Sequence, residues 1–194
     1  MNSVCVFCGS AAGTNPAYAD AARELGGALA ARGLALVYGG GRVGLMGQVA
    51  SAALAAGGTV VGVIPHALAL KEIAQDDCTE LIVVDMMHER KARMADRADA
   101  FVALPGGYGT CDELFEILTW GQLGIHQKPV AILNVNGFFT PLLAWLDHVV
   151  TEGLLKPKHR ELLLVAEGVP ELLATLAAWT PPAPTTKWID ADER

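Results

Sequence analysis

Seven short apolar runs recur along the chain, and most of the segments between them are rich in alanine and leucine at helical spacing. Strands that alternate with helices pair in parallel, because each helix returns the chain to the start of the next strand. The runs are apolar on both sides, which is typical of a sheet covered on both faces. We therefore predict an α/β fold with a doubly wound parallel sheet of the Rossmann-like, nucleotide-binding type. The predicted strands span residues 3–8, 34–39, 59–65, 80–85, 100–105, 129–134 and 162–167.

The length of 194 residues is enough to bury one core, and neither a repeat nor a linker divides the chain. Hydrophobic residues make up 52% of the sequence and charged residues 18%, so we expect a compact domain rather than disorder. The composition shifts only near the C-terminus, where prolines predict an extended arm. The expected organisation is a single domain over residues 1–180 and an extended tail over residues 181–194.

The net charge of −7 argues against binding to nucleic-acid polymers, which are usually held by a basic surface. A small anion can still bind in a local positive pocket. No apolar run approaches the roughly 18 residues of a membrane helix, and the first residues lack the basic start of a signal peptide. We therefore expect a cytoplasmic protein that binds a small molecule and no membrane.

Four cysteines include one C-x-x-C pair, but no second pair and no flanking histidine completes a zinc set. Two of them fall in the first predicted strand and point to opposite faces, so packing is favoured over metal or redox chemistry. Reduced thiols fit the cytosol. The histidines lack ligand spacing as well, and we predict no metal site. The cysteines are Cys5, Cys8, Cys78 and Cys111.

Three glycine-rich segments follow the first, second and fifth predicted strands, at residues 8–10, 38–47 and 104–110. Ligands of such sheets bind at the carboxyl ends of the strands. Glycine lets the backbone approach a ligand closely, and the amides of a following helix start attract phosphate. Tight strand-to-helix turns are the alternative for any one loop, but three at one edge favour an anion site. Ser10, Gly40 and Gly41 are expected to contact that anion.

Two nucleotide signatures fail here. Gly39, Gly41 and Gly44 match G-x-G-x-x-G, yet they follow the second strand, and the third strand ends without the acidic residue that would hold a ribose. Leu45 stands where a P-loop lysine would follow Gly44. We therefore expect neither a dinucleotide cofactor nor Walker-type ATP binding, and we predict no cofactor.

The segment after the fifth strand combines exposed glycine amides with Thr110, which can cap the next helix and offer a hydroxyl to phosphate. Glu113 has the spacing of a capping box with Thr110, which is one reading of its role. The other reading is a carboxylate one helical turn from a bound phosphate, where it can reach a ribose. Asp112 can share either role, but adjacent helix positions point about 100° apart, so we favour Glu113.

A basic cluster lies in residues 85–100, where Arg90, Arg93, Met94 and Arg97 share one helix face. For Arg93 and Arg97 we favour a solvated stripe paired with neighbouring carboxylates. Arg90 differs because it lies near the helix start, just past the fourth strand. Its guanidinium is expected at the same edge as the glycine loops.

These motifs together carry a resemblance to a known family. The sequences "CVFCGS", "GGGRVGLMG", "MHERK" and "PGGYGT-x-x-E" resemble, in this order, the Lonely guy (LOG) family of cytokinin-activating phosphoribohydrolases, often mislabelled as lysine decarboxylases. The resemblance covers about residues 3–165. It implies a doubly wound nucleotide-binding fold, a homodimer and hydrolysis of the N-glycosidic bond of an adenosine 5′-monophosphate, plain or N6-modified. The products would be free base and ribose 5-phosphate.

By the same resemblance, the catalytic pair falls on Arg90 and Glu113. The sequence departs from the family mildly, because "TCDE" replaces the more usual "TLEE", and residues 66–78 are less typical, so the base and its preference stay open. The substrate contacts implied by the family are Glu72, Arg90, Lys91, Gly106, Gly107, Tyr108, Gly109, Thr110, Cys111, Asp112 and Thr119.

The chemistry is consistent with these roles. Cleavage of a C–N glycosidic bond builds positive charge on the ribose, so a fixed carboxylate beside the sugar stabilises the transition state. Glu113 can do this and can orient or deprotonate water. Arg90 cannot donate a proton near neutral pH and is better suited to position Glu113, phosphate or the departing base.

Alternatives from other classes are a carrier and a decarboxylase. A non-catalytic carrier of a phosphorylated cofactor, like the molybdenum-cofactor carriers, would use the same glycine loops without needing Arg90 and Glu113 together. Pyridoxal-dependent lysine decarboxylation needs a Schiff-base lysine beside a phosphate cradle, and Lys91 in "HERK" fits the hydrolase reading better. For the assembly, apolar helices around residues 113–124 and 138–150 suggest a dimer surface, with core packing as the alternative.

Overall fold

A computed structural model describes residues 1–69 and 74–181 of the chain. All seven predicted strands are present in one sheet with the order β4-β3-β2-β1-β5-β6-β7, and every neighbouring pair is parallel. The doubly wound fold is therefore confirmed. The strands are β1 (Ser3–Phe7), β2 (Ala35–Tyr38), β3 (Val60–Pro65), β4 (Glu80–Val84), β5 (Ala100–Ala103), β6 (Val130–Leu133) and β7 (Leu163–Ala166).

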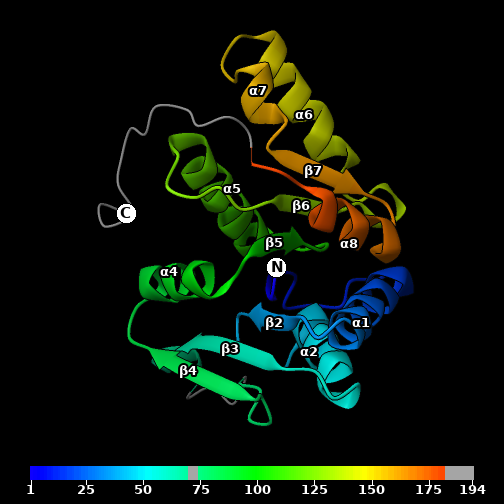
Figure 1. Ribbon diagram of the computed structural model, residues 1–194, viewed down its shortest axis with the longest axis vertical. Coiled ribbons are helices and arrows are strands. Elements are labelled where there is room, and N and C mark those ends of the chain that lie inside the picture. Colours follow the sequence, from blue (N-terminus) through cyan, green and yellow to red (C-terminus); the bar gives the residue numbers. More distant parts are fainter. Residues whose placement is uncertain (70–73, 182–194) are drawn as a thin grey trace.

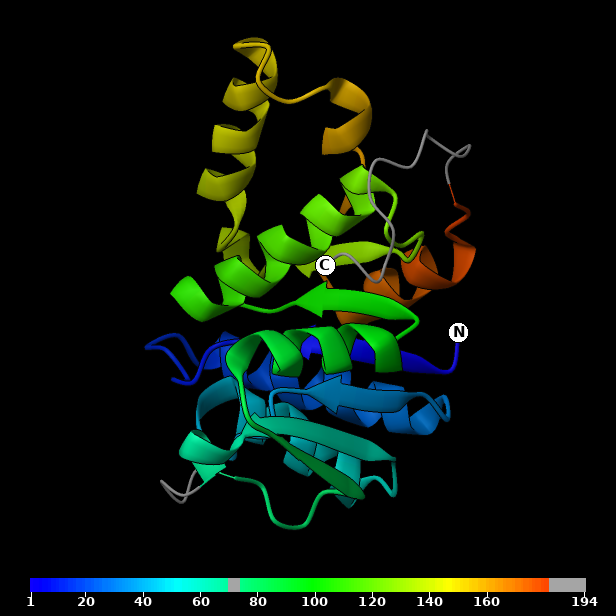
Figure 2. The ribbon, with the colours of Figure 1, turned by 90° about the vertical axis from the view of Figure 1, so that its left-hand side faces the viewer.

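The helices form two layers, as Figures 1 and 2 show. Helices α1, α2 and α8 pack one apolar cluster against one face of the sheet, and α4, α5 and α6 pack a second cluster against the other. In Figure 2, α4 and α5 lie in front of the sheet, and α1 and α2 lie behind it. The helical segments are α1 (Pro16–Ala31), α2 (Gly44–Ala55), α3 (His66–Leu68), α4 (Met87–Arg97), α5 (Tyr108–Leu123), η2 (Val135–Gly137), α6 (Thr140–Thr151), α7 (Pro157–Arg160) and α8 (Val169–Ala178).

The sheet has its switch point between β1 and β5, which are hydrogen-bonded neighbours at its centre. From β1 the chain enters α1 in one helix layer, and from β5 it enters α5 in the other. The loops after these strands therefore diverge, and a crevice opens at the carboxyl edge between them. Any ligand-binding site is expected in this crevice.

Two expectations fall partly outside the described residues. The predicted tail is one, because only its first residue, Pro181, is described. The substrate contact implied for Glu72 is the other, because residues 70–73 are not described. Among the helices of the described part, none combines the length and apolar character needed to cross a membrane.

Candidate active site

Arg90 lies in the first turn of α4, just beyond the carboxyl end of β4. Only 11% of its side chain is exposed. Its Nε donates a hydrogen bond to the carbonyl of Val63 at 3.0 Å, and its Nη2 donates to the carbonyl of Gly39 at 3.2 Å. These carbonyls belong to β3 and to the residue after β2. The guanidinium is thus fixed against the main chain at the edge where the glycine loops begin.

Glu113 lies in α5, and its carboxylate meets this guanidinium. Its Oε1 accepts a hydrogen bond from Nη1 of Arg90 at 3.2 Å, and 11% of its side chain is exposed. The two residues assigned to catalysis by resemblance therefore form a nearly buried ion pair across α4 and α5. A buried charge is costly unless it is paired and hydrogen-bonded, and Arg90 meets this requirement through three acceptors.

The structure corrects the expected helix cap. Helix α5 begins at Tyr108 after Gly107, without a side-chain hydrogen bond at its N-cap, so Thr110 lies inside the first turn and is buried. Glu113 is therefore too far along the helix to close a capping box. A Cβ at Gly106 would lie 2.0 Å from Oγ1 of Thr110, so glycine at this position leaves room for Thr110 inside the first turn. Pairing with Arg90, rather than capping, accounts for the position of Glu113.

The ionisation of Glu113 is perturbed by its surroundings. Burial raises the pKa of Glu113 from its ordinary value of 4.5 to about 6, although Arg90 lowers it. Asp112 and Glu116 raise this pKa slightly further, whereas Lys91 lowers it. The group is thus a carboxylate at neutral pH that takes up a proton in mildly acidic solution. A titration near neutrality is common among groups that act in acid–base or electrostatic catalysis.

Lys91 lies beside this pair and has its own acidic partners. Its Nζ lies 3.2 Å from Asp112 and 3.0 Å from Glu116. Burial alone would lower the pKa of Lys91, but hydrogen bonds to Glu116 and Asp112 more than offset it, so the pKa is raised. The side chain of Asp112 is 62% exposed and pairs with Lys91, whereas Glu113 pairs with Arg90. The two neighbouring carboxylates therefore have different cationic partners.

The other arginines of α4 behave as a solvated stripe, as predicted. Arg93 pairs with Glu89 at 3.6 Å, and Arg97 makes two hydrogen bonds to Glu80 at 2.9 and 3.0 Å. All these side chains are partly exposed. The basic cluster thus contributes Arg90 and Lys91 to the site and leaves the rest at the surface.

The three glycine-rich loops are joined through Gly9. Its amide donates to the carbonyl of Pro105 at 3.0 Å, and its carbonyl accepts from the amide of Leu45 at 2.9 Å. Gly44 has a φ of +58°, and a Cβ there would lie 2.2 Å from the carbonyl carbon of Ser10. The loop after β2 therefore braces the loop after β1, and the leading amide of α2 is used internally. Of the three loops predicted to favour an anion site, the loop after β2 thus has one amide at its helix start already hydrogen-bonded within the protein.

A cavity of about 290 Å³ lies at the switch point. Its walls are the loop after β1, the start of the β5–α5 loop and two aromatic side chains, Tyr18 and Phe138. These two rings pack edge to face with centroids 5.5 Å apart. Of the predicted contacts, Ser10, Gly106 and Gly107 line this cavity. Sequence reasoning did not identify the aromatic walls, because Tyr18 and Phe138 come from distant segments without a local motif.

Gly40 and Gly41 make main-chain contacts with the segment after β3. The carbonyl of Gly40 accepts a hydrogen bond from the amide of Gln75 at 2.9 Å, and Gly41 forms an antiparallel bridge with Ala74. Neither residue lines the switch-point cavity. These glycines hold the segment after β3 against the sheet edge.

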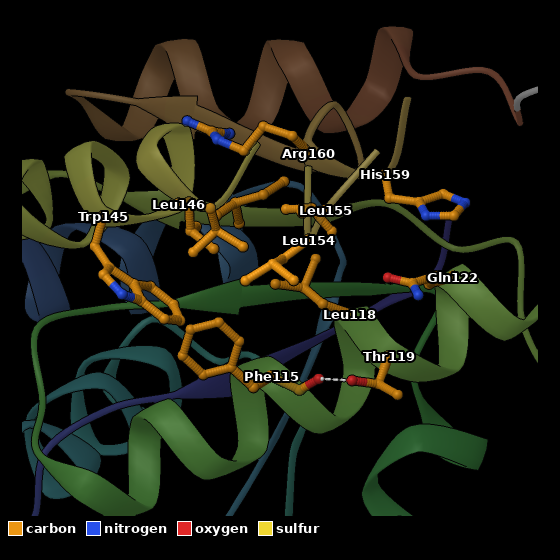
Figure 3. Close-up of a pocket in the computed structure, with 12 residues that line it drawn as sticks. Phe115, Leu118, Thr119, Gln122, Trp145, Leu146, Leu154, Leu155, His159 and Arg160 are labelled. Carbon is orange, nitrogen blue, oxygen red and sulfur yellow. Dashed lines mark hydrogen bonds between the residues drawn. The ribbon is translucent and has the colours of Figure 1, made fainter. Parts of the chain in front are cut away.

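Thr119 is not brought to the ion pair. It lies farther along α5 and lines a separate groove of about 210 Å³ between α5, α6 and α7, drawn in Figure 3. Its Oγ1 donates a hydrogen bond to the carbonyl of Phe115 at 2.7 Å. A contact between Thr119 and a substrate bound at Glu113 of the same chain is therefore not supported by this geometry.

Metal chemistry has no obvious ligand set in the described part of the chain. There, no group of three or more histidine, cysteine or acidic side chains has the geometry to hold a metal ion. The four cysteines are free, and burial raises the pKa of Cys5 and Cys8 well above the usual range of a thiol. Both thiols are therefore protonated packing groups beneath the site.

Comparisons with known proteins agree with these motifs. The family model described as "Possible lysine decarboxylase" matches residues 46–176. A rice protein (Oryza sativa subsp. japonica) named probable cytokinin riboside 5′-monophosphate phosphoribohydrolase LOGL9 is 53% identical over 178 residues, covering 92% of this chain and 78% of that protein. A protein from Arabidopsis thaliana named cytokinin riboside 5′-monophosphate phosphoribohydrolase LOG5 is 51% identical over 178 residues, covering 92% of this chain and 78% of that protein.

Solved structures share the fold at lower identity. The Moco carrier protein of Chlamydomonas reinhardtii matches with a TM-score of 0.70 and 25% identity, covering 91% of this chain and 96% of that one. A molybdenum cofactor binding protein from Rippkaea orientalis matches with a TM-score of 0.69 and 21% identity, which shows the fold alone. With half of its residues identical to relatives aligned over most of their length, the chain belongs to the LOG family, whose family model carries the older lysine decarboxylase description.

Proposed function

We propose that this protein hydrolyses the N-glycosidic bond of an adenosine 5′-monophosphate, plain or N6-modified as in a cytokinin nucleotide. Water adds to the anomeric carbon of the ribose, the C–N bond breaks, and free base and ribose 5-phosphate are released. The observation that carries the proposal is the buried pair of Arg90 and Glu113 beside the amide-rich start of α5. The LOG relatives, which bear the name of this activity, support it.

Each part of the site has a chemical task in this proposal. The 5′-phosphate binds at the loop of Gly106 and Gly107, where the first amides of α5 and the helix dipole attract an anion. Glu113 lies six residues beyond Gly107, less than two helical turns along α5, so we expect a ribose reaching from that phosphate to come beside its carboxylate. The carboxylate stabilises positive charge on the ribosyl group and orients water. Arg90 keeps Glu113 in place and ionised.

A carrier of a phosphorylated cofactor is the alternative, favoured by the fold of the Moco carrier protein. Such a carrier needs the glycine loops but not a carboxylate whose pKa is raised to about 6 beside a fixed guanidinium. Lysine decarboxylation is disfavoured by Lys91. A Schiff-base lysine needs a lowered pKa, whereas the acidic partners of Lys91 raise its pKa.

We also propose a cytoplasmic homodimer. The groove of Figure 3 lies between Trp145 on α6 and Leu154 beyond it, whose exposed fractions are 53% and 82%. Exposed apolar side chains of this size around a groove are typical of a subunit contact. The alternative given in the sequence analysis was that these apolar helices only pack into the core, but Trp145 and Leu154 remain exposed to solvent in the single chain. For the compartment, the free cysteines are consistent with a reducing cytoplasm.

The activity itself can be tested by substrate comparison. Free base should appear from AMP or from isopentenyladenosine 5′-monophosphate, and kcat/KM for adenosine should be lower by at least about 100-fold, because charge-assisted phosphate contacts supply binding energy. Chromatography of the released base measures this. Tight nucleotide binding without base release would support the carrier, and equal kcat/KM for AMP and adenosine would contradict the phosphate site.

Replacing Glu113 by glutamine should remove the charge with little change in shape. We expect kcat to fall by roughly 10²- to 10⁴-fold, equivalent to about 3 to 5 kcal/mol of transition-state stabilisation. The calorimetric Kd for the nucleotide should change little, because phosphate is held by main-chain amides. Glu80→Gln, which breaks the surface pair with Arg97, is the matched control and should keep wild-type kcat. A near-normal kcat in Glu113→Gln would rule out this mechanism.

The raised pKa of Glu113 predicts a pH dependence. If the carboxylate is the active form, kcat/KM, which reports ionisations of the free enzyme, should fall about tenfold per pH unit below pH 6, and this limb should vanish in Glu113→Gln. Between pH 4.5 and 6 the folded state binds more protons at this group than the unfolded state does. Protonation of Glu113 therefore stabilises the fold as the pH falls. A kcat/KM that stays flat down to pH 5 would contradict the prediction.

The dimer can be tested at Leu154. Light scattering of the wild-type protein should report about twice the 20.4 kDa of one chain. Leu154→Lys should shift the mass toward the monomer without lowering the stability of the chain, because this side chain is largely exposed. Val83→Lys, on the opposite edge strand, is the control and should stay dimeric. A wild-type mass of one chain at micromolar concentration would overturn the proposal.

A further inference from the structure

Gly39 lies directly against the guanidinium of Arg90. A Cβ built on Gly39 would lie 1.8 Å from Nη2 and 3.0 Å from Cζ of Arg90, both far inside van der Waals contact. The next neighbour, Sδ of Met46, would lie at an ordinary 3.4 Å. The carbonyl of Gly39 is also one of the acceptors of Nη2. Arg90 therefore occupies the space that any side chain at position 39 would need.

The requirement at this position is space rather than backbone conformation. The glycines of this loop with positive φ are Gly40 at 71° and Gly44 at 58°, and Gly39 is not among them. An alanine at position 39 therefore does not meet the strain of a positive φ. The clash is with the end of a flexible side chain, which can move, and the main chain can stay in place. Substitution at Gly39 thus displaces Arg90 selectively.

We infer that Gly39 is a positioning residue for the proposed reaction: its missing side chain provides the space in which Arg90 lies flat against β2 and β3 and reaches Glu113. The inference rests on the proposed function. The G-x-G-x-x-G match includes Gly39 but does not explain it, because the dinucleotide signature fails here, and Gly39 is not among the expected phosphate contacts. The positive φ angles of Gly40 and Gly44 explain why glycine is needed at those positions. At position 39, the guanidinium of Arg90 explains it.

Displacement of Arg90 has a defined electrical consequence. The charged groups that act on Glu113 are Arg90 and Lys91 from α4 and Asp112 and Glu116 from its own helix. The strand beneath contributes only the protonated thiols of Cys5 and Cys8. Arg90 is the largest of the influences that lower the pKa of Glu113. Without it the pKa rises further, and the carboxylate form is populated only at higher pH.

The test is a double-mutant cycle of Gly39→Ala and Arg90→Ala, with AMP as the substrate. Gly39→Ala should lower kcat on the order of 10²-fold with little change in KM, as expected for misplacement of a catalytic group. Its acid limb should move to higher pH. In the Arg90→Ala background, Gly39→Ala should have no further effect on kcat. Gly27→Ala, where a Cβ would meet nothing within 4 Å, is the control and should match wild type.

Melting temperatures of the wild type, Gly39→Ala, Arg90→Ala and the double variant test the space requirement independently of activity. Any loss of Tm that Gly39→Ala causes in the wild-type background should be absent when Gly39→Ala is added to Arg90→Ala, because the clash is removed with the guanidinium. Replacing Met46 by alanine should not restore it. If Gly39→Ala turns over like wild type, or lowers kcat and Tm equally in both backgrounds, the inference is wrong. If the wild-type protein releases no base from any nucleotide, the proposed function fails, while the Tm cycle still decides the role of Gly39.

Discussion

The contact of Arg90 with Glu113 is the interaction on which the site depends, because it draws four elements to one point. The guanidinium spans the carbonyls of Gly39 and Val63 and the carboxylate on α5. Removing one partner of a buried pair typically costs about 3 to 5 kcal/mol, since the remaining charge loses its partner in a poorly solvated place. The pair therefore stabilises its own geometry, and α4 and α5 cannot shift separately without breaking it.

A second set of contacts fixes the opposite side of the crevice. Gly9 bonds through its amide to the loop after β5 and through its carbonyl to the start of α2. The crevice at the switch point is thus bounded by loops that hydrogen-bond to one another. Rigid placement of this kind lowers the cost of ordering a bound nucleotide, because the protein has little conformational entropy to lose on binding.

Much of this arrangement can be predicted from the sequence, and the failures have physical reasons. All seven strands were found because each run is apolar on both sides and ends in turn residues. The predicted Thr110 cap was wrong because α5 begins at Tyr108, with Thr110 inside its first turn in space that a side chain at Gly106 would occupy, and no spacing rule states such a contact. Thr119 shares the helix of Glu113, yet its side chain lines another groove. Two acceptors of Arg90 are main-chain carbonyls. Every residue has such a carbonyl, so the residue types in the sequence do not indicate these hydrogen bonds.

The ionisation of Glu113 connects the fold to the chemistry. Burial raises its pKa, so keeping the group charged at neutral pH costs the fold stability, and the guanidinium offsets only part of that cost. A carboxylate in this condition gains more from a nearby positive charge than a solvated one does, because fewer water dipoles compete for it. A ribosyl group that becomes positive only as its base departs supplies such a charge. The site is therefore better matched to the transition state of glycosidic cleavage than to a neutral ground-state ribose.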